Sequence, residues 1–293
     1  MTRSGDNLRS IYAMLLAIVM FSLMDTVMKL LAEHYPAMQV AALRGLTSLP
    51  LVLMYVGWRG GFGSMFKVRW SLHLLRGALG IAMLSLFAFA LKKLSLAEAY
   101  TIFFIAPALI AALSVVFLKE VVNSARWIAI GVGLIGVIIV LRPTGAGMLT
   151  LGGLAVLGAA ACYAVSAIAV RILGRTDSGD HMILWLMLML SAGASVLAAP
   201  NWVSIRAADM WLLLAMAVTG FIGQIAITEA FNKGEASKIA PLEYTALAWG
   251  VLLDYLLWQA LPDRFTLIGA AVIIGSGVYL IRNEREHAAA EHP

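Results

Sequence analysis

Residues 99–143 read AYTIFFIAPALIAALSVVFLKEVVNSARWIAIGVGLIGVIIVLRP, and residues 239–283 read IAPLEYTALAWGVLLDYLLWQALPDRFTLIGAAVIIGSGVYLIRN. Each stretch is a long apolar run, a short polar break, and a second apolar run that opens with arginine and is rich in glycine. The two stretches lie about 140 positions apart. This similarity indicates a duplicated chain.

The composition assigns the duplicated chain to the membrane proteins. Hydrophobic residues make up 62% of the 293 positions and charged residues 13%, whereas a soluble domain has about 45–50% and about 25%. The net charge of +5 comes without a basic helix of the kind that binds nucleic acid, so no nucleic-acid partner is expected. The single cysteine, Cys162, excludes an intramolecular disulfide. We therefore expect an all-α, polytopic membrane protein.

The apolar runs predict ten transmembrane helices, since each run is near the ~20 residues needed to cross the bilayer. Ten helices in two halves leave five per half, an odd number, so the second half enters the membrane from the opposite side. Such inverted repeats are a recurring design of secondary transporters. We expect repeats at 9–142 and 149–282 and a cytoplasmic tail at 283–293. The ten spans are expected near residues 9–32, 37–57, 71–91, 96–118, 125–142, 149–172, 181–199, 209–231, 238–258 and 265–282.

Basic residues predict the orientation, because cytoplasmic loops are enriched in lysine and arginine. With the N-terminus inside, most of the 21 basic residues fall in inside segments, among them Arg59, Lys67, Arg69 and Arg76. The outside segments then hold Lys92, Lys93, Arg142, Arg206 and Arg264. We expect a multi-pass protein of the cell (inner) membrane with both termini in the cytoplasm.

A set of short motifs carries a family resemblance. In order along the chain they are Ala97-Glu98-Ala99, Ile105-Ala106-Pro107, Lys119-Glu120, Ala236-Ser237, Ala240-Pro241-Leu242-Glu243-Tyr244, Pro262-Asp263 and Gly269. The set resembles the drug/metabolite transporter superfamily, specifically ten-helix carriers with two EamA-type repeats. One departure is Gln259-Ala260, where the family usually has Gly-Glu. The resemblance implies ATP-independent export or exchange of small metabolites, with the amino-acid-exporting (YddG-like) branch preferred.

Ionisable residues inside spans are costly and usually face an interior or a water-filled path. Asp25 and Lys29 are four residues apart and so share a helix face; they form either part of the pathway or a neutralised pair that helps packing. Arg44 likewise lies either on the pathway or in a contact that pairs two helices. The expected gate or coupling residues are Asp25, Lys29, Arg44, Glu229, Glu243 and Asp254.

Aromatic residues within spans offer apolar area with a polar tip, which suits amphipathic ligands. The resemblance implies that helices four, six and nine surround a central cavity. We expect substrate contacts from Tyr100, Phe104, Tyr163, Gln224, Tyr244 and Trp249, with helix packing as the alternative role for each. Pro107 and Pro241 lie in matching helices and are expected as hinges, or else as static kinks, because proline frees a backbone carbonyl.

Motifs of other protein classes are missing. The sequence contains no P-loop, His-Glu-x-x-His or Cys-x-x-Cys pattern, so neither an ATP-driven pump nor a cofactor or metal site is expected. We predict a secondary transporter, not an enzyme, that exports or exchanges small amphipathic metabolites, foremost amino acids, by alternating access. Another metabolite or drug carrier of the same superfamily is the first alternative; an intramembrane enzyme or a structural membrane protein is the second. The expected partners are a small-molecule substrate and the bilayer, with a monomer preferred and a dimer left open.

Overall fold

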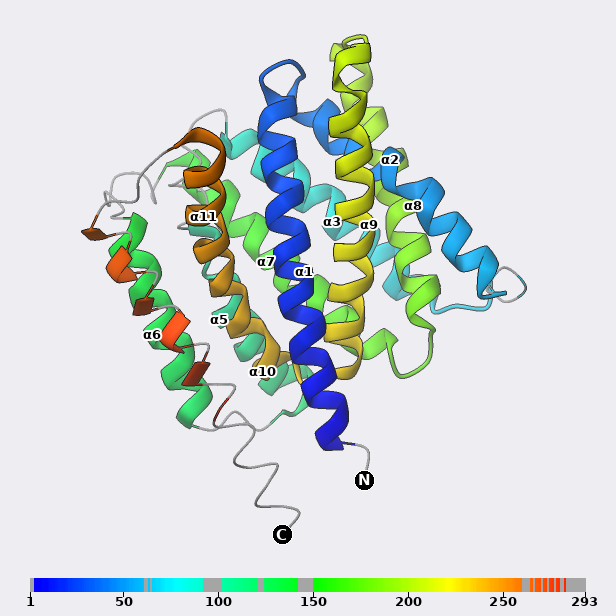
Figure 1. Ribbon diagram of the computed structural model, residues 1–293. Coiled ribbons are helices and arrows are strands. Elements are labelled where there is room, and N and C mark those ends of the chain that lie inside the picture. The colour runs from blue at the N-terminus through cyan, green and yellow to red at the C-terminus, as the bar shows by residue number, and fades with distance from the viewer. Residues whose placement is uncertain are drawn as a thin grey trace.

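The computed structural model describes residues 3–60, 63, 65–91, 102–120, 124–141 and 150–259, and thereafter 264, 265, 267–269, 271, 272, 274–276, 278, 279 and 282. Regular structure in these residues is helical throughout (Figure 1). In the first half the helices are α1 (Arg3–Ala32), α2 (Ala37–Trp58), α3 (Trp70–Leu91), α5 (Ala106–Leu113) with a π-helical turn Ser114–Leu118, and α6 (Ser124–Leu141).

The second half repeats this series. Its helices are α7 (Leu151–Leu173), α8 (Gly179–Ala198), α9 (Met210–Lys233), α10 (Ala236–Ile239), the 3₁₀ segment Ala240–Thr245, and α11 (Ala246–Trp258), with short 3₁₀ turns at Ala199–Asn201 and Ala207–Asp209. Two of these helices have a side-chain cap at the N-terminus. Thr150 accepts a hydrogen bond from the Gly153 N–H at the start of α7, and Ser178 accepts one from the His181 N–H at the start of α8. Each cap satisfies a backbone N–H that has no partner within the helix.

Length and apolar composition allow six of the described helices to cross a membrane. They include Leu8–Ala32, Met38–Trp58, Trp70–Phe87, Leu151–Leu173, Gly179–Asn201 and Ala207–Lys233. Large apolar side chains on their outer surface are exposed, for example Met54, Val196 and Trp211. A soluble protein would bury many of these groups, whereas lipid accepts them. The chain is therefore a polytopic membrane protein.

Helix pairing joins the two halves. α2 packs along α8, α1 along α9, and α3 along α7. A two-fold axis that exchanges the halves in chain order maps the α2–α8 pair onto itself. The same axis exchanges α1–α9 with α3–α7. The helix contacts therefore follow the symmetry that a duplicated five-helix unit requires.

Two loop contacts show that the repeats are inverted. The Tyr35 hydroxyl, after α1, donates to Asp209 Oδ2 at 2.7 Å and accepts the Arg206 N–H at 2.9 Å. The equivalent Asp177, after α7, accepts the Arg69 N–H at 3.0 Å and lies 2.9 Å from His73 Nε2. The first contact lies at the end of α1 and the second at the start of α3, at opposite faces of the bundle.

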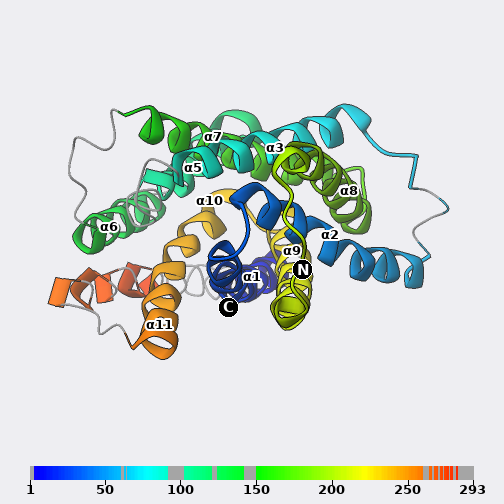
Figure 2. The same cartoon turned by 90° about the horizontal axis from the view of Figure 1, so that it is seen from above.

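We call the face with Arg9, Arg69 and Asp177 the N-terminal face and the face with Tyr35 and Asp209 the far face. In each half, the connection after the first helix binds the segment that leads into the third helix of the other half. The same contact on opposite faces confirms the predicted fold, an all-α membrane protein of two inverted five-helix repeats. Seen along the helices, α6, α5, α7, α3 and α8 lie on one side and α11, α1, α9 and α2 on the other (Figure 2).

Candidate functional site

A cavity of about 110 Å³ lies between the two groups of helices. Its wall is built by α1, α2, α3, α7, α8 and α9, with helices of both repeats on each side. Three residues proposed from the sequence line it, namely Arg44, Tyr163 and Gln224. Gln224 also donates a hydrogen bond to Thr228 Oγ1 at 3.3 Å, one turn along α9. We call this hollow the central cavity.

Arg76 also lines the central cavity, and the sequence interpretation missed it. The sequence predicts Arg76 in an inside connection, and the structure shows that this prediction is wrong. It lies in the second turn of α3 and is 2% exposed. Its Nη1 donates to the Met182 carbonyl at 3.1 Å. The available signal was its position inside the apolar run 71–91, where an arginine needs an interior position.

A charged stripe on α1 leads from the central cavity to the far face. Phe21 lines the cavity, and Asp25 and Lys29 follow it at four-residue spacing on the same helix face. Both charged residues are exposed within the span. The guanidinium of Arg44 lies 5.5 Å above the Phe21 ring, and its charge interacts with that of Asp25. Because charged groups avoid lipid, this stripe is the part of α1 at which a polar approach to the cavity from the far face is expected.

Tyr163 connects the central cavity to the ninth span. Its hydroxyl donates to Glu243 Oε1 at 2.8 Å, which joins α7 to the 3₁₀ segment before α11. The Phe103 ring lies 5.7 Å from the Tyr163 ring, between centroids. Sequence reasoning placed Glu243 at a helix end with a gate or coupling role. The structure adds its hydrogen-bond partner, the hydroxyl of Tyr163, which lines the central cavity.

The remaining predicted substrate residues lie elsewhere. Tyr244 is fully buried and packs on α6, where its ring lies directly against Gly133 and leaves no space for a Cβ. Phe104 lies 6.1 Å from Tyr244, between ring centroids. Trp249 is partly buried against the apolar cluster that also contacts Tyr163. Tyr100 lies outside the described residues, and for Asp254 the structure describes only the backbone, within α11.

The two predicted hinge prolines both lie at interruptions of their spans. Pro107 is in the first turn of α5, after turn residues at 104 and 105. Pro241 opens the 3₁₀ segment that separates α10 from α11. Equivalent helices of the two repeats are therefore interrupted at equivalent prolines. These positions are suited to bending, because the regular helical hydrogen bonds are already broken there.

Ion pairs gather at the N-terminal face below the central cavity. Glu229 Oε1 lies 3.1 Å from Arg9 Nε and 2.6 Å from Lys233 Nζ. Arg59 Nε lies 2.9 Å from Asp180 Oδ2. The Glu229–Lys233 pair lies within α9, whereas Arg9–Glu229 joins α1 to α9 and Arg59–Asp180 joins α2 to α8, so the latter two pairs connect the repeats. The predicted gate residue Glu229 thus lies in a network that holds this face together.

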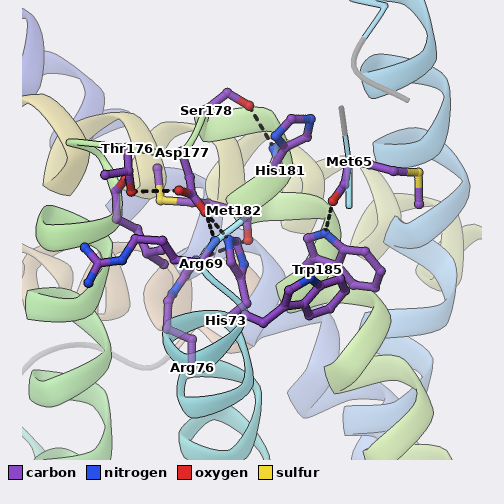
Figure 3. A network of polar contacts seen from close by, with 12 residues as sticks. Met65, Arg69, His73, Arg76, Thr176, Asp177, Ser178, His181, Met182 and Trp185 are labelled. Carbon is purple, nitrogen blue, oxygen red and sulfur yellow. Dashed lines mark hydrogen bonds and ion pairs between the residues drawn. The ribbon is translucent and has the colours of Figure 1, made fainter. Parts of the chain in front are cut away.

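The contact between α3 and the loop after α7 belongs to the same face (Figure 3). Burial alone would raise the pKa of Asp177. Hydrogen bonds from the Thr176 hydroxyl, the Arg69 backbone N–H and His73 outweigh it, so the pKa of this carboxyl lies below its usual value. Asp177 therefore remains a charged acceptor. The Trp185 indole N–H adds a bond to the Met65 carbonyl at 2.8 Å.

Comparison with known proteins identifies this arrangement. A model of the EamA-like transporter family matches residues 8–142 and again residues 150–282. The chain belongs to the EamA-like transporter family. It is accordingly a member of the drug/metabolite transporter superfamily and a transporter, not an enzyme.

Several relatives are similar over nearly their full length. The riboflavin transporter of Vibrio cholerae is 28% identical over 282 residues, which cover 95% of this chain and 94% of that protein. The S-adenosylmethionine uptake transporter of Rickettsia conorii is 25% identical, with 95% and 94% covered. The pseudopaline exporter of Pseudomonas aeruginosa is 23% identical, with 92% and 95% covered. A solved crystal structure matches with a TM-score of 0.83 at 20% identity, covering 97% of this chain and 100% of that one, which supports the same fold.

Proposed function

We propose that this secondary transporter moves small amphipathic metabolites through the central cavity by alternating access. The observation that carries the proposal is the position of the cavity, between the two inverted repeats and with helices of both repeats in its wall. Substrate sites of inverted-repeat transporters lie at this interface. The wall combines apolar side chains with the hydroxyl of Tyr163 and the amide of Gln224, which suits an amphipathic ligand.

The size of the cavity supports a conformational cycle. Pockets for drug-sized ligands have about 300–1,000 Å³, and the central cavity has about 110 Å³. A metabolite that fills a pocket of that kind requires the two groups of helices to move apart. We propose that the spans bend at Pro107 and Pro241, and that the Arg59–Asp180 pair, which joins α2 of one group to α8 of the other (Figure 2), separates when the N-terminal face opens.

The relatives favour a broader substrate range than amino acids. Their names specify riboflavin, S-adenosylmethionine and pseudopaline. An amino-acid exporter of the YddG-like branch remains a second candidate, carried by the aromatic and amide lining of Tyr163 and Gln224. We therefore expect transport of at least one organic metabolite from a panel of riboflavin, S-adenosylmethionine and radiolabelled amino acids.

Proteoliposomes with the purified protein provide the test. Uptake or counterflow above that of protein-free vesicles is expected for at least one compound, without ATP. The Tyr163→Ala, Gln224→Ala double variant tests the site itself. It alters the cavity wall and should lose most of the transport signal. Absence of transport for the whole panel, in both directions, would contradict the proposed substrate class.

We also propose that the N-terminal face is cytoplasmic, since the basic residues concentrate there. In a Cys162→Ser background, Arg175→Cys should react with a membrane-impermeant thiol reagent only after the cells are opened. Asn201→Cys should react in intact cells. Both positions are exposed, at opposite faces of the bundle. Labelling of Arg175→Cys alone in intact cells would reverse the orientation.

A further inference from the structure

The charge of Arg76 has no counterion in the described part of the chain. The side chain is 2% exposed, and the ion pairs of the described residues do not include it. Its Nη1 donates to one backbone carbonyl, and its buried Nε has no hydrogen-bond partner. A buried, unpaired guanidinium costs stability. A residue that lowers the stability of the fold is expected to serve a function instead.

Stabilisation of α8 does not explain why a buried arginine is present at position 76. The acceptor of the Arg76 bond is the carbonyl of Met182, in the first turns of α8. A helix carbonyl at this position already accepts the N–H four residues ahead. Loss of the arginine would therefore leave no backbone group unsatisfied. The bond fixes the position of the guanidinium in the cavity wall more than it stabilises the helix.

The remaining lining adds to the positive charge. The described wall includes a second arginine, Arg44, and no aspartate or glutamate. Arg44 lies in the second turn of α2, near the far face, whereas Arg76 lies in the second turn of α3, near the N-terminal face. Asp25 offsets part of the Arg44 charge. The net charge of the cavity wall is therefore positive, and it is concentrated at Arg76.

We propose that the central cavity binds an anionic group of its substrate, a carboxylate or a phosphate, on the guanidinium of Arg76. This inference rests on the proposed transport function and specifies the substrate class. The planar guanidinium offers two parallel N–H donors to such a group. The apolar remainder of the ligand packs against Phe21, Met83 and Leu190, and Arg44 lies on the path to the far face. The substrate is thus an amphipathic anion or a zwitterion with an exposed carboxylate.

Matched probes test the charge requirement directly. Binding to the purified full-length protein in detergent is measured by thermal shift and titration calorimetry. The probes are 3-phenylpropanoate, phenyl phosphate and the neutral 3-phenylpropanamide. We expect at least one anion to bind and the amide to bind at least about tenfold more weakly, since a hydrogen bond to a charged group contributes that much. The two anions distinguish a carboxylate site from a phosphate site.

Variants at Arg76 assign the effect to this residue. Arg76→Gln should weaken binding of the anion at least about tenfold and leave the amide unchanged, whereas Arg76→Lys should recover part of the affinity. The control is Arg175→Gln, at an exposed position outside the cavity, which should bind like the parent protein. Arg76→Met, measured without any ligand, should unfold at the same or a higher temperature because an unpaired buried charge has been removed.

Several results would overturn the proposal. In the binding measurements they are equal binding of the anion and the amide, unchanged anion affinity in Arg76→Gln, and no binding by either anion. A lower unfolding temperature of Arg76→Met would also count against it, since it would assign Arg76 a structural role. Transport of a metabolite that is unaffected by Arg76→Gln would refute this inference and leave the transport function intact. Arg76-dependent anion binding without any transport would refute the function alone.

Discussion

Replacement of Gly45 by leucine should eliminate most of the folded protein. Gly45 is in α2, which packs along α8 of the other repeat. A Cβ at Gly45 would lie 2.6 Å from Ser191 Oγ, 3.0 Å from Ser191 Cα and 3.2 Å from Ser191 N. Backbone atoms of α8 cannot move aside as a flexible side chain can. Even Gly45→Ala should destabilise the protein by about 1–3 kcal/mol, the usual cost of overpacking.

The matched control is Gly131→Leu. Gly131 lies in α6, and a Cβ there would meet nothing within 4 Å. Both variants add the same side chain to a helical glycine, so they differ only in the space around it. Yield and monodispersity in detergent are measured by fluorescence-detected size-exclusion chromatography, together with the unfolding temperature. Wild-type values for Gly45→Leu would show that α2 and α8 are not in this close contact.

The sequence predicted the fold because the bilayer restricts the choices. Backbone groups in lipid must be satisfied within a helix, so each long apolar run becomes a span. The similarity of 99–143 and 239–283 and the odd number of runs per half then predicted inverted repeats. The Tyr35–Asp209 and Asp177–His73 contacts agree with that prediction. They could not be foreseen, because they join residues far apart in the chain.

The site was less predictable for a physical reason. A span buried among helices and lipid is apolar on all sides, so its sequence does not indicate which face lines a cavity. Tyr163 and Tyr244 were both predicted to contact substrate, because each is an aromatic residue within a span. In the structure, Tyr163 lines the central cavity and Tyr244 packs on Gly133. Arg76 was missed because its nearness to Arg69 and Lys67 made it resemble a loop residue.

We expect transport by the parent protein to depend on pH, and Glu243→Gln should lower the rate at least about tenfold and remove that dependence. Inside the membrane, an ionisable carboxyl marks a proton or substrate pathway more often than a packing contact. Among the described residues, the Tyr163 hydroxyl is the hydrogen-bond partner of Glu243, and no cation pairs with it. A carboxyl without a cation can gain and lose a proton as the surrounding helices move. A glutamine keeps an oxygen that accepts the Tyr163 hydrogen bond but cannot exchange a proton, so it separates proton coupling from packing.

Two further variants complete this experiment. Tyr163→Phe removes the donor and keeps the carboxyl, so it should reduce the rate while the pH dependence persists. Glu235→Gln removes a carboxylate from the N-terminal face, where Glu235 Oε1 lies 3.1 Å from Lys238 Nζ, and should transport like the parent. Initial rates in proteoliposomes are compared at several pH values from about 5.5 to 9, a span that reaches the values documented for buried carboxyls. A Glu243→Gln variant that keeps both the rate and the pH profile of the parent would limit Glu243 to joining α7 with the ninth span, because the hydrogen bond would then account for the whole of its contribution.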